Sequence, residues 1–86
     1  MERIKKCVRQ WLIESTRSEF EEVILEAKLT QRQEHIIRNR ILDSKMNFQI
    51  AMDNNVSDKT IERDLQLAYM AILRVLQKRN HVFNIA

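Results

Sequence analysis

Apolar residues recur along most of this chain with the period of an α-helix. In the first 28 residues they follow the three- and four-residue spacing of one helix face, at Ile4, Cys7, Val8, Trp11, Leu12, Phe20, Val23, Ile24 and Ala27. The pattern thins between Leu12 and Phe20, where Thr16 with Glu19, or Ser18 with Glu21, fits a capping box that would start a new helix. The segment is one long helix or two, and the capping pattern favours two.

The pattern of apolar residues after Leu29 predicts three further helices. Thr30 and Gln33 fit a capping box at the start of the first, whose inward residues are Ile36, Ile37 and Ile41 and whose pattern fades near positions 43–45. A short helix follows at about Asn47 to Asn54. Ser57 then caps a long last helix, with Ile61, Leu65, Ala68, Tyr69, Ile72 and Leu76 on its inward face. Residues 80–86 show no clear period, and we expect a frayed tail.

The composition supports an all-α fold of four or five helices. The 86 residues include no glycine and no proline, whereas these two normally make up about 7% and 5% of a protein. Without them the usual hairpin turns and phosphate-binding loops are missing, so sheet-rich folds and nucleotide-binding loops are excluded or nearly so. So short a chain has a modest core, which a partner chain would enlarge.

Charge and reactive residues argue against a membrane protein, a metalloprotein and an enzyme. The net charge is +3, and no apolar run approaches the ~20 residues that a membrane helix needs. The single cysteine, Cys7, cannot form an internal disulfide, so we expect a reducing cytoplasm. His35 and His81 have no further ligand at metal spacing. No catalytic arrangement is visible, and we expect no cofactor and no small-molecule substrate.

A short helix, a three-residue turn and a capped longer helix form the order of a helix-turn-helix. Ala51 is small where two helices would cross closely, and Asn55 tolerates the left-handed conformation that ends a helix when glycine is absent. Val56 and Ile61 would fill the angle between the helices. Ser57 would cap the second helix and let its first turn point outward. The helix-turn-helix is therefore expected in the C-terminal half.

The stretch Leu29-Thr30 … Arg32-Gln33 … Ile36-Ile37 … Arg40, followed by this helix-turn-helix, resembles region 4 of bacterial sigma factors. It is equally similar to the small sigma-like regulators with which phages switch on late genes. The resemblance covers about Leu29 to Leu76, and its most specific part runs from Val56 to Leu65. It implies that the last helix enters the major groove and that the protein, alone or with RNA polymerase, reads a promoter element. Asn54 and Met46 depart from the family pattern, where an apolar and a capping residue are usual.

These patterns divide the chain into three parts. Residues 1–28 form an N-terminal helical segment for packing or oligomerisation. Residues 29–79 form the domain that resembles region 4, and residues 80–86 form the tail. The expected function is sequence-specific binding of double-stranded DNA in transcription regulation, as activator or as repressor.

Candidate DNA contacts lie on the outward face of the last helix. Arg63 suits a guanine edge and Gln66 an adenine edge, and Glu62 could accept from cytosine. With Arg38 and Lys45 as outward-pointing phosphate contacts, the full candidate set is Ser57, Lys59, Thr60, Glu62, Arg63, Gln66, Arg38 and Lys45. The alternative is a solvated face on which Lys59 and Arg63 pair with local acids. Arg40 falls on the inward face, where it needs a partner, and we expect a structural salt bridge to Glu62 or Asp53.

The charge of the reading unit keeps a second function open. Residues 46–65 hold two basic side chains against four acidic ones, so cations must come from elsewhere if this unit approaches phosphate. The N-terminal segment and the helix after Thr30 can supply them. The alternative is a protein-interaction module on the same scaffold, which binds RNA polymerase, a sigma factor or a replication protein and not DNA.

The last helix carries a second apolar stripe, formed by Leu67, Met70 and Leu73. A helix that is apolar on two sides is expected to be buried on both. Either the N-terminal helices cover this stripe or a second copy does, and the sequence favours a two-fold homodimer.

Overall fold

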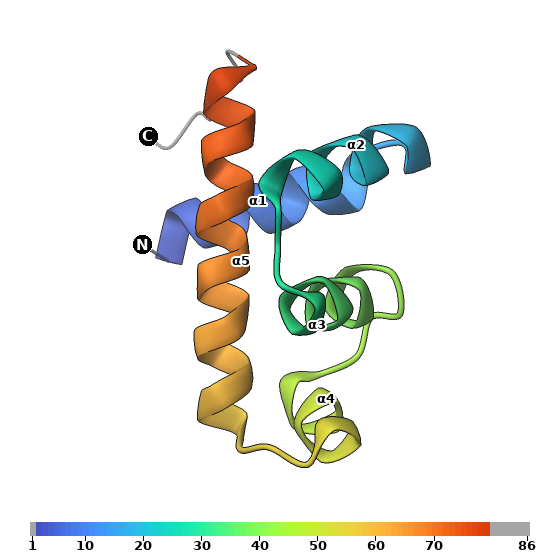
Figure 1. The fold of residues 1–86 in the computed structure, drawn as a ribbon, viewed down its shortest axis with the longest axis vertical. Helices are drawn as coiled ribbons and strands as arrows, with labels where there is room; N and C mark the ends of the chain where they lie inside the picture. The colour runs from blue at the N-terminus through green and yellow to red at the C-terminus, as the bar shows by residue number, and fades with distance from the viewer. Residues whose placement is uncertain (1, 80–86) are drawn as a thin grey trace.

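The computed structural model describes residues 2–79, which form five α-helices and no strands (Figure 1). The helices are α1 (Glu2–Glu14), α2 (Arg17–Ala27), α3 (Gln31–Ile41), α4 (Asn47–Asn54) and α5 (Asp58–Lys78). This confirms the all-α expectation. The prediction for the tail and the remark on His81 fall outside the described residues.

The N-terminal segment is two helices, and side chains at the break between them form hydrogen bonds with the backbone groups there. Thr16 accepts a hydrogen bond from the backbone N–H of Glu19, and the Glu19 carboxylate accepts one from the backbone N–H of Thr16, which completes the first of the two expected capping boxes. These hydrogen bonds lower the pKa of Glu19. Ser15, just before the break, donates its hydroxyl to the carbonyl of Leu12.

The helix-turn-helix has the predicted boundaries. Asn55 ends α4 with a φ of 55°, in the left-handed conformation expected of it. Three residues later α5 begins, and the Ser57 hydroxyl accepts a hydrogen bond from the backbone N–H of Thr60 at 3.2 Å. Met46 offers no side-chain cap to α4, but Gln49 accepts from its backbone N–H at 2.9 Å. The short helix α4 is thus held at both ends.

The fold is organised around α5, which packs against each of the other four helices. In Figure 1 α5 runs nearly the whole height of the molecule, α1 crosses it near its middle, and α4 lies beside its N-terminal end. A single hydrophobic core includes buried residues from every helix: Val8, Leu12, Phe20, Val23, Ile24, Ile36, Ile37, Ile50, Ala51, Ile61, Leu65, Ala68, Tyr69, Ile72, Val75 and Leu76. This packing fixes α1 beside the helix-turn-helix, which matters for the site below.

The second apolar stripe of α5 is only partly outward-facing. Leu67 is 51% exposed, Met70 is half-buried, and Leu73 packs against the core. Leu73 is therefore the part of the stripe that packs within the chain itself. Both α1 and α2 pack on α5, as in the alternative in which the N-terminal helices cover the stripe.

Candidate nucleic-acid interface

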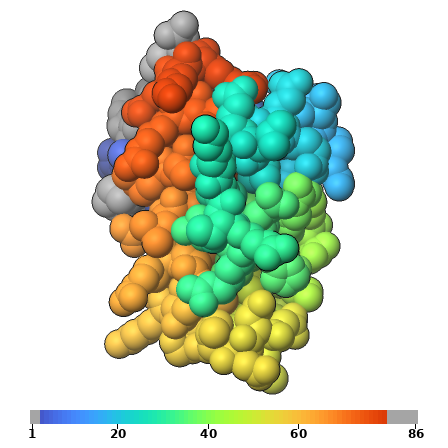
Figure 2. Space-filling model, viewed as in Figure 1, coloured from blue at the N-terminus to red at the C-terminus, as the bar shows by residue number. Residues whose placement is uncertain are grey.

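The first turns of α5 present a polar face to solvent. Lys59, Glu62, Arg63 and Gln66 are all exposed there, as the sequence predicts. In Figure 2 long side chains from this segment, coloured yellow to orange, project from the lower left edge of the molecule. Ser57 and Thr60 lie at the start of the helix, and their hydroxyl oxygens are 3.0 Å apart. These two side chains therefore serve first as the cap of α5.

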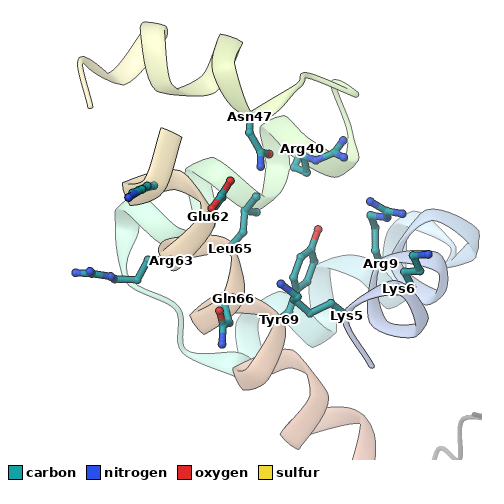
Figure 3. A pocket seen from close by; sticks show the side chains of 11 residues that line it. Lys5, Lys6, Arg9, Arg40, Asn47, Glu62, Arg63, Leu65, Gln66 and Tyr69 are labelled. Carbon is teal, nitrogen blue, oxygen red and sulfur yellow. The ribbon is translucent and has the colours of Figure 1, made fainter. Parts of the chain in front are cut away.

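This face forms one wall of a cleft between α5 and three other helices. The cleft has a volume of about 590 Å³ and is lined by Lys5, Lys6, Arg9, Arg40, Asn47, Lys59, Glu62, Arg63, Leu65, Gln66 and Tyr69. Figure 3 shows that α1 forms the wall opposite α5, with Arg40 of α3 and Asn47 of α4 between them. The cleft thus joins α5 to the N-terminal segment. Sequence reasoning noted the cations of that segment but could not place them beside α5.

The cleft gathers positive charge far beyond the chain's average. Six of its lining side chains are basic and one, Glu62, is acidic, which leaves five positive charges in excess. The whole chain carries only +3, so the residues outside the cleft sum to −2. Walls of one charge sign around a low-dielectric cleft focus the field and attract an oppositely charged ligand. This arrangement favours an anion.

Several cations of the cleft form no ion pair with the residues that the structure describes. Among residues 2–79, no carboxylate lies within 4.0 Å of Lys6, Arg9, Arg40, Lys59 or Arg63. Outside the cleft, five arginines and lysines form ion pairs: Arg17 with Glu21, Arg32 with Asp64, Arg38 with Glu21 and Glu34, Lys45 with Asp53, and Arg79 with Glu22 and Glu26. The cleft therefore keeps its charge available to a ligand.

The orientation predicted for Arg38 is wrong. Its guanidinium donates to both carboxylate oxygens of Glu21, at 2.8 and 2.7 Å, and lies over the ring of Phe20. These bonds raise the pKa of Arg38 and lower the pKa of Glu21 to about 2. The error arose because a helical wheel shows which side of α3 a residue occupies but not that α2 covers that side. Arg38 connects α2 to α3 and does not line the cleft.

Lys45 is also paired, although it remains near the surface. Its ammonium group donates to the Asp53 carboxylate at 2.9 Å, and this hydrogen bond raises the pKa of Lys45. It too lies outside the cleft lining. The pair offsets one of the four acidic charges counted in the reading unit.

A second acidic charge of the reading unit is neutralised within the fold. Asp64 is only 5% exposed, and the guanidinium of Arg32 pairs with it, with Nε 2.8 Å from one carboxylate oxygen and Nη2 3.3 Å from the other. The salt bridge expected for Arg40 is absent: Arg40 donates to the backbone carbonyl of Lys45 and joins the cleft. Only Asp58 and Glu62 therefore remain as exposed, unpaired acids of that unit.

Tyr69 and Asn47 bring uncharged polar groups to the cleft. Tyr69 is 7% exposed; burial raises the pKa of its phenol, and the nearby charges of Arg40 and Arg9 act in the opposite direction. Its hydroxyl makes no hydrogen bond with the residues that the structure describes. The Oδ1 atom of Asn47 is buried and likewise unpaired within that part of the chain. Sequence reasoning assigned Tyr69 to the core and missed its polar end.

A different surface lies on α4. Phe48 and Met52, one turn apart, are 53% and 73% exposed, and Met46 beside them is 54% exposed. Ile50 and Ala51 on the other side of α4 are buried in the core. Large apolar side chains grouped on one short helix are unusual on a small monomer and often mark contact sites.

The described residues contain no group of histidine, cysteine and acidic side chains that could hold a metal ion. His35 is hydrogen-bonded to Asn39, with 3.1 Å between their nitrogens, and Cys7 is half-buried. Within residues 2–79 no helix is both long and apolar enough to cross a bilayer.

Comparison with known proteins adds no relative. No family model, no curated protein and no solved structure matches this chain.

Proposed function

We propose that this protein binds double-stranded DNA through its helix-turn-helix, as a sequence-specific regulator of transcription. The observation that carries the proposal is the basic cleft beside the first turns of α5, with five positive charges in excess in a chain whose total is +3. Phosphate neutralisation supplies most of the affinity for DNA. The cleft supplies the cations that the helix-turn-helix itself lacks.

The exposed side chains of α5 suit base readout. Arg63 and Gln66 are one turn apart, exposed and free of ion pairs within the described residues, so both can reach a base edge in the major groove. Because residues 29–76 resemble region 4 of sigma factors, we further propose that the target is a promoter element and that RNA polymerase is a partner. The chemistry of the cleft is that of binding, and we propose no catalytic activity.

Binding and readout are tested together by selection from a random duplex library, followed by anisotropy titrations at two salt concentrations. We expect Arg63→Ala to cost ~1–3 kcal/mol on the selected site and to relax its preference at one base pair. The matched control is Arg74→Ala, which removes an exposed arginine from the same helix outside the cleft. Wild-type protein that binds no duplex at low salt would refute the proposal.

The apolar surface of α4 favours a second candidate function, docking onto a protein such as RNA polymerase. Phe48 and Met52 point away from the core, so their replacement should not disturb folding. Phe48→Ser/Met52→Ser should abolish capture of polymerase and leave DNA affinity unchanged. The two functions are compatible because the α4 surface and the cleft share no residue.

The two-fold homodimer stays a prediction, with a smaller surface than the sequence suggested. Leu67 alone of its stripe is mostly exposed, so this face offers little apolar area to a second copy. Light scattering tests it directly: a dimer of twice the 10.4 kDa chain mass should become monomeric in Leu67→Lys.

A further inference from the structure

Three side chains from three helices converge at the end of the cleft nearest α1. Figure 3 shows the hydroxyl of Tyr69 directed into the space between Arg40 of α3 and Arg9 of α1. Both arginines are close enough to act electrostatically on the Tyr69 phenol. None of the three belongs to α4 or to the exposed face of α5's first turns, so their arrangement calls for an explanation beyond base readout.

Among the described residues, these groups keep hydrogen-bonding capacity for a ligand, since Arg40 donates only to the backbone carbonyl of Lys45. Arg9 and Arg40 have no carboxylate partner among residues 2–79, and the hydroxyl of Tyr69, a largely buried residue, makes no hydrogen bond there. Two guanidinium groups brought near one hydroxyl repel each other, and all three are hydrogen-bond donors. An anion with several acceptor oxygens would relieve the repulsion and satisfy the donors together.

We propose that Arg9, Arg40 and the Tyr69 hydroxyl form a binding site for one phosphodiester of the DNA backbone. The two N–H groups of a guanidinium fork match two phosphate oxygens, and a phenol can donate a further hydrogen bond to the same phosphate. Lys59 and Arg63 line the same cleft, so a strand that passes the first turns of α5 would reach α1 next. The proposal rests on DNA binding as the function. It extends the footprint beyond the helix-turn-helix to the N-terminal segment.

The salt dependence of binding tests the two arginines. Each neutralised phosphate contributes about 0.9 to the slope of log affinity against log salt. Because the site holds one phosphate, the double variant Arg9→Gln/Arg40→Gln should flatten the slope by about 0.9, so that it loses about 3.5-fold less affinity than wild type between 50 and 200 mM salt. Each single variant should flatten the slope by part of that amount. Sequence preference should not change. Arg74→Gln removes one exposed positive charge from α5 outside the cleft, and its slope should equal that of wild type.

Tyr69→Phe tests the hydroxyl without changing charge. It should weaken binding to all duplexes by about tenfold, because the lost donor served a charged acceptor. The salt slope should stay as in wild type. The melting temperature of the free protein should not fall, because the hydroxyl has no partner among the described residues. Unchanged DNA affinity in Tyr69→Phe would remove the hydroxyl from the site.

The outcomes separate this site from DNA binding itself. If Arg9→Gln and Arg40→Gln behave as Arg74→Gln does while Arg63→Ala still relaxes base preference, the phosphate site is refuted and the proposed function stands. If wild-type protein binds no duplex, both proposals fail. The source of the phosphate is identified by titration with inorganic phosphate and with a mononucleotide. Binding is monitored through the NMR signals of Arg9 and Arg40. Saturation by either at micromolar concentration, without competition by duplex, would assign the site to a small ligand and overturn the proposal.

Discussion

The ion pair of Arg32 with Asp64 leads to a prediction about the stability of the fold, which can be tested without any DNA. Asp64 lies on α5 and its side chain is 7% exposed, whereas the Arg32 side chain on α3 is 56% exposed. Arg32→Gln would leave a buried carboxylate on α5 without its cation. A buried charge that loses its partner must be rehydrated or protonated, and either costs free energy of folding.

The partial exposure of Arg32 sets the magnitude. Removing one partner of a fully buried pair costs about 3–5 kcal/mol, and removing one from an exposed pair costs about 0–1 kcal/mol. Because water can reach Asp64 through the space that Arg32 leaves, we expect an intermediate loss of about 2 kcal/mol. For a domain of this size that lowers the melting temperature by roughly 8–16 °C.

Thermal unfolding followed by circular dichroism measures this loss. Arg17→Gln is the matched control, since Arg17 and Glu21 form an exposed pair within α2 whose side chains are 72% and 41% exposed. We expect that control to change stability by less than about 0.5 kcal/mol. Adding Asp64→Asn to Arg32→Gln should recover much of the loss, because no buried charge then remains. If Arg32→Gln costs no more than the control, Asp64 does not depend on Arg32 for its burial.

Three further predictions concern the acid range, the helix cap and the cleft. Arg38 lowers the pKa of Glu21 to about 2 from an ordinary 4.5. This pair therefore stabilises the fold fully above pH 4.5 and progressively less as the pH falls toward 2. In Glu21→Gln the melting temperature should depend less on pH over that range. Ser57→Ala should cost ~1 kcal/mol by removing the cap of α5, and an unchanged melting curve would contradict its role. Glu62→Gln removes the acid of the cleft and should tighten binding to all duplexes roughly two- to fivefold; loss of preference at one base pair would instead identify Glu62 as a base reader.

The helices and their limits could be predicted from the sequence because local interactions fix them. Thr16, Thr30 and Ser57 cap the helices that the sequence assigned to them, and Asn55 ends α4. Each of these residues acts on backbone groups no more than four positions away, so its effect is visible in a short window. The exposed face of α5 followed from periodicity for the same reason.

The candidate site could be predicted only in part because its charges depend on contacts between distant residues. Arg32 and Asp64 are 32 positions apart, and Arg38 and Glu21 are 17 apart. No local pattern indicates such pairs, so Arg38 was assigned to solvent and Arg40 to a salt bridge. The wall that α1 contributes to the cleft depends on how α1 crosses α5, which amphipathic spacing does not determine.

The charge of a sequence window is a poor guide to the charge that a ligand meets. Residues 46–65 count as −2, yet Arg32 neutralises Asp64 and Lys45 neutralises Asp53. Both cations come from outside the window, and once they are included the unit no longer repels phosphate as a whole. Asp53 and Asp64 are paired away from the cleft, whereas cations from α1, α3 and α5 inside it have no carboxylate partner among the described residues. The same feature that argued against DNA binding in the sequence therefore becomes, in the folded chain, a separation of charge that favours it.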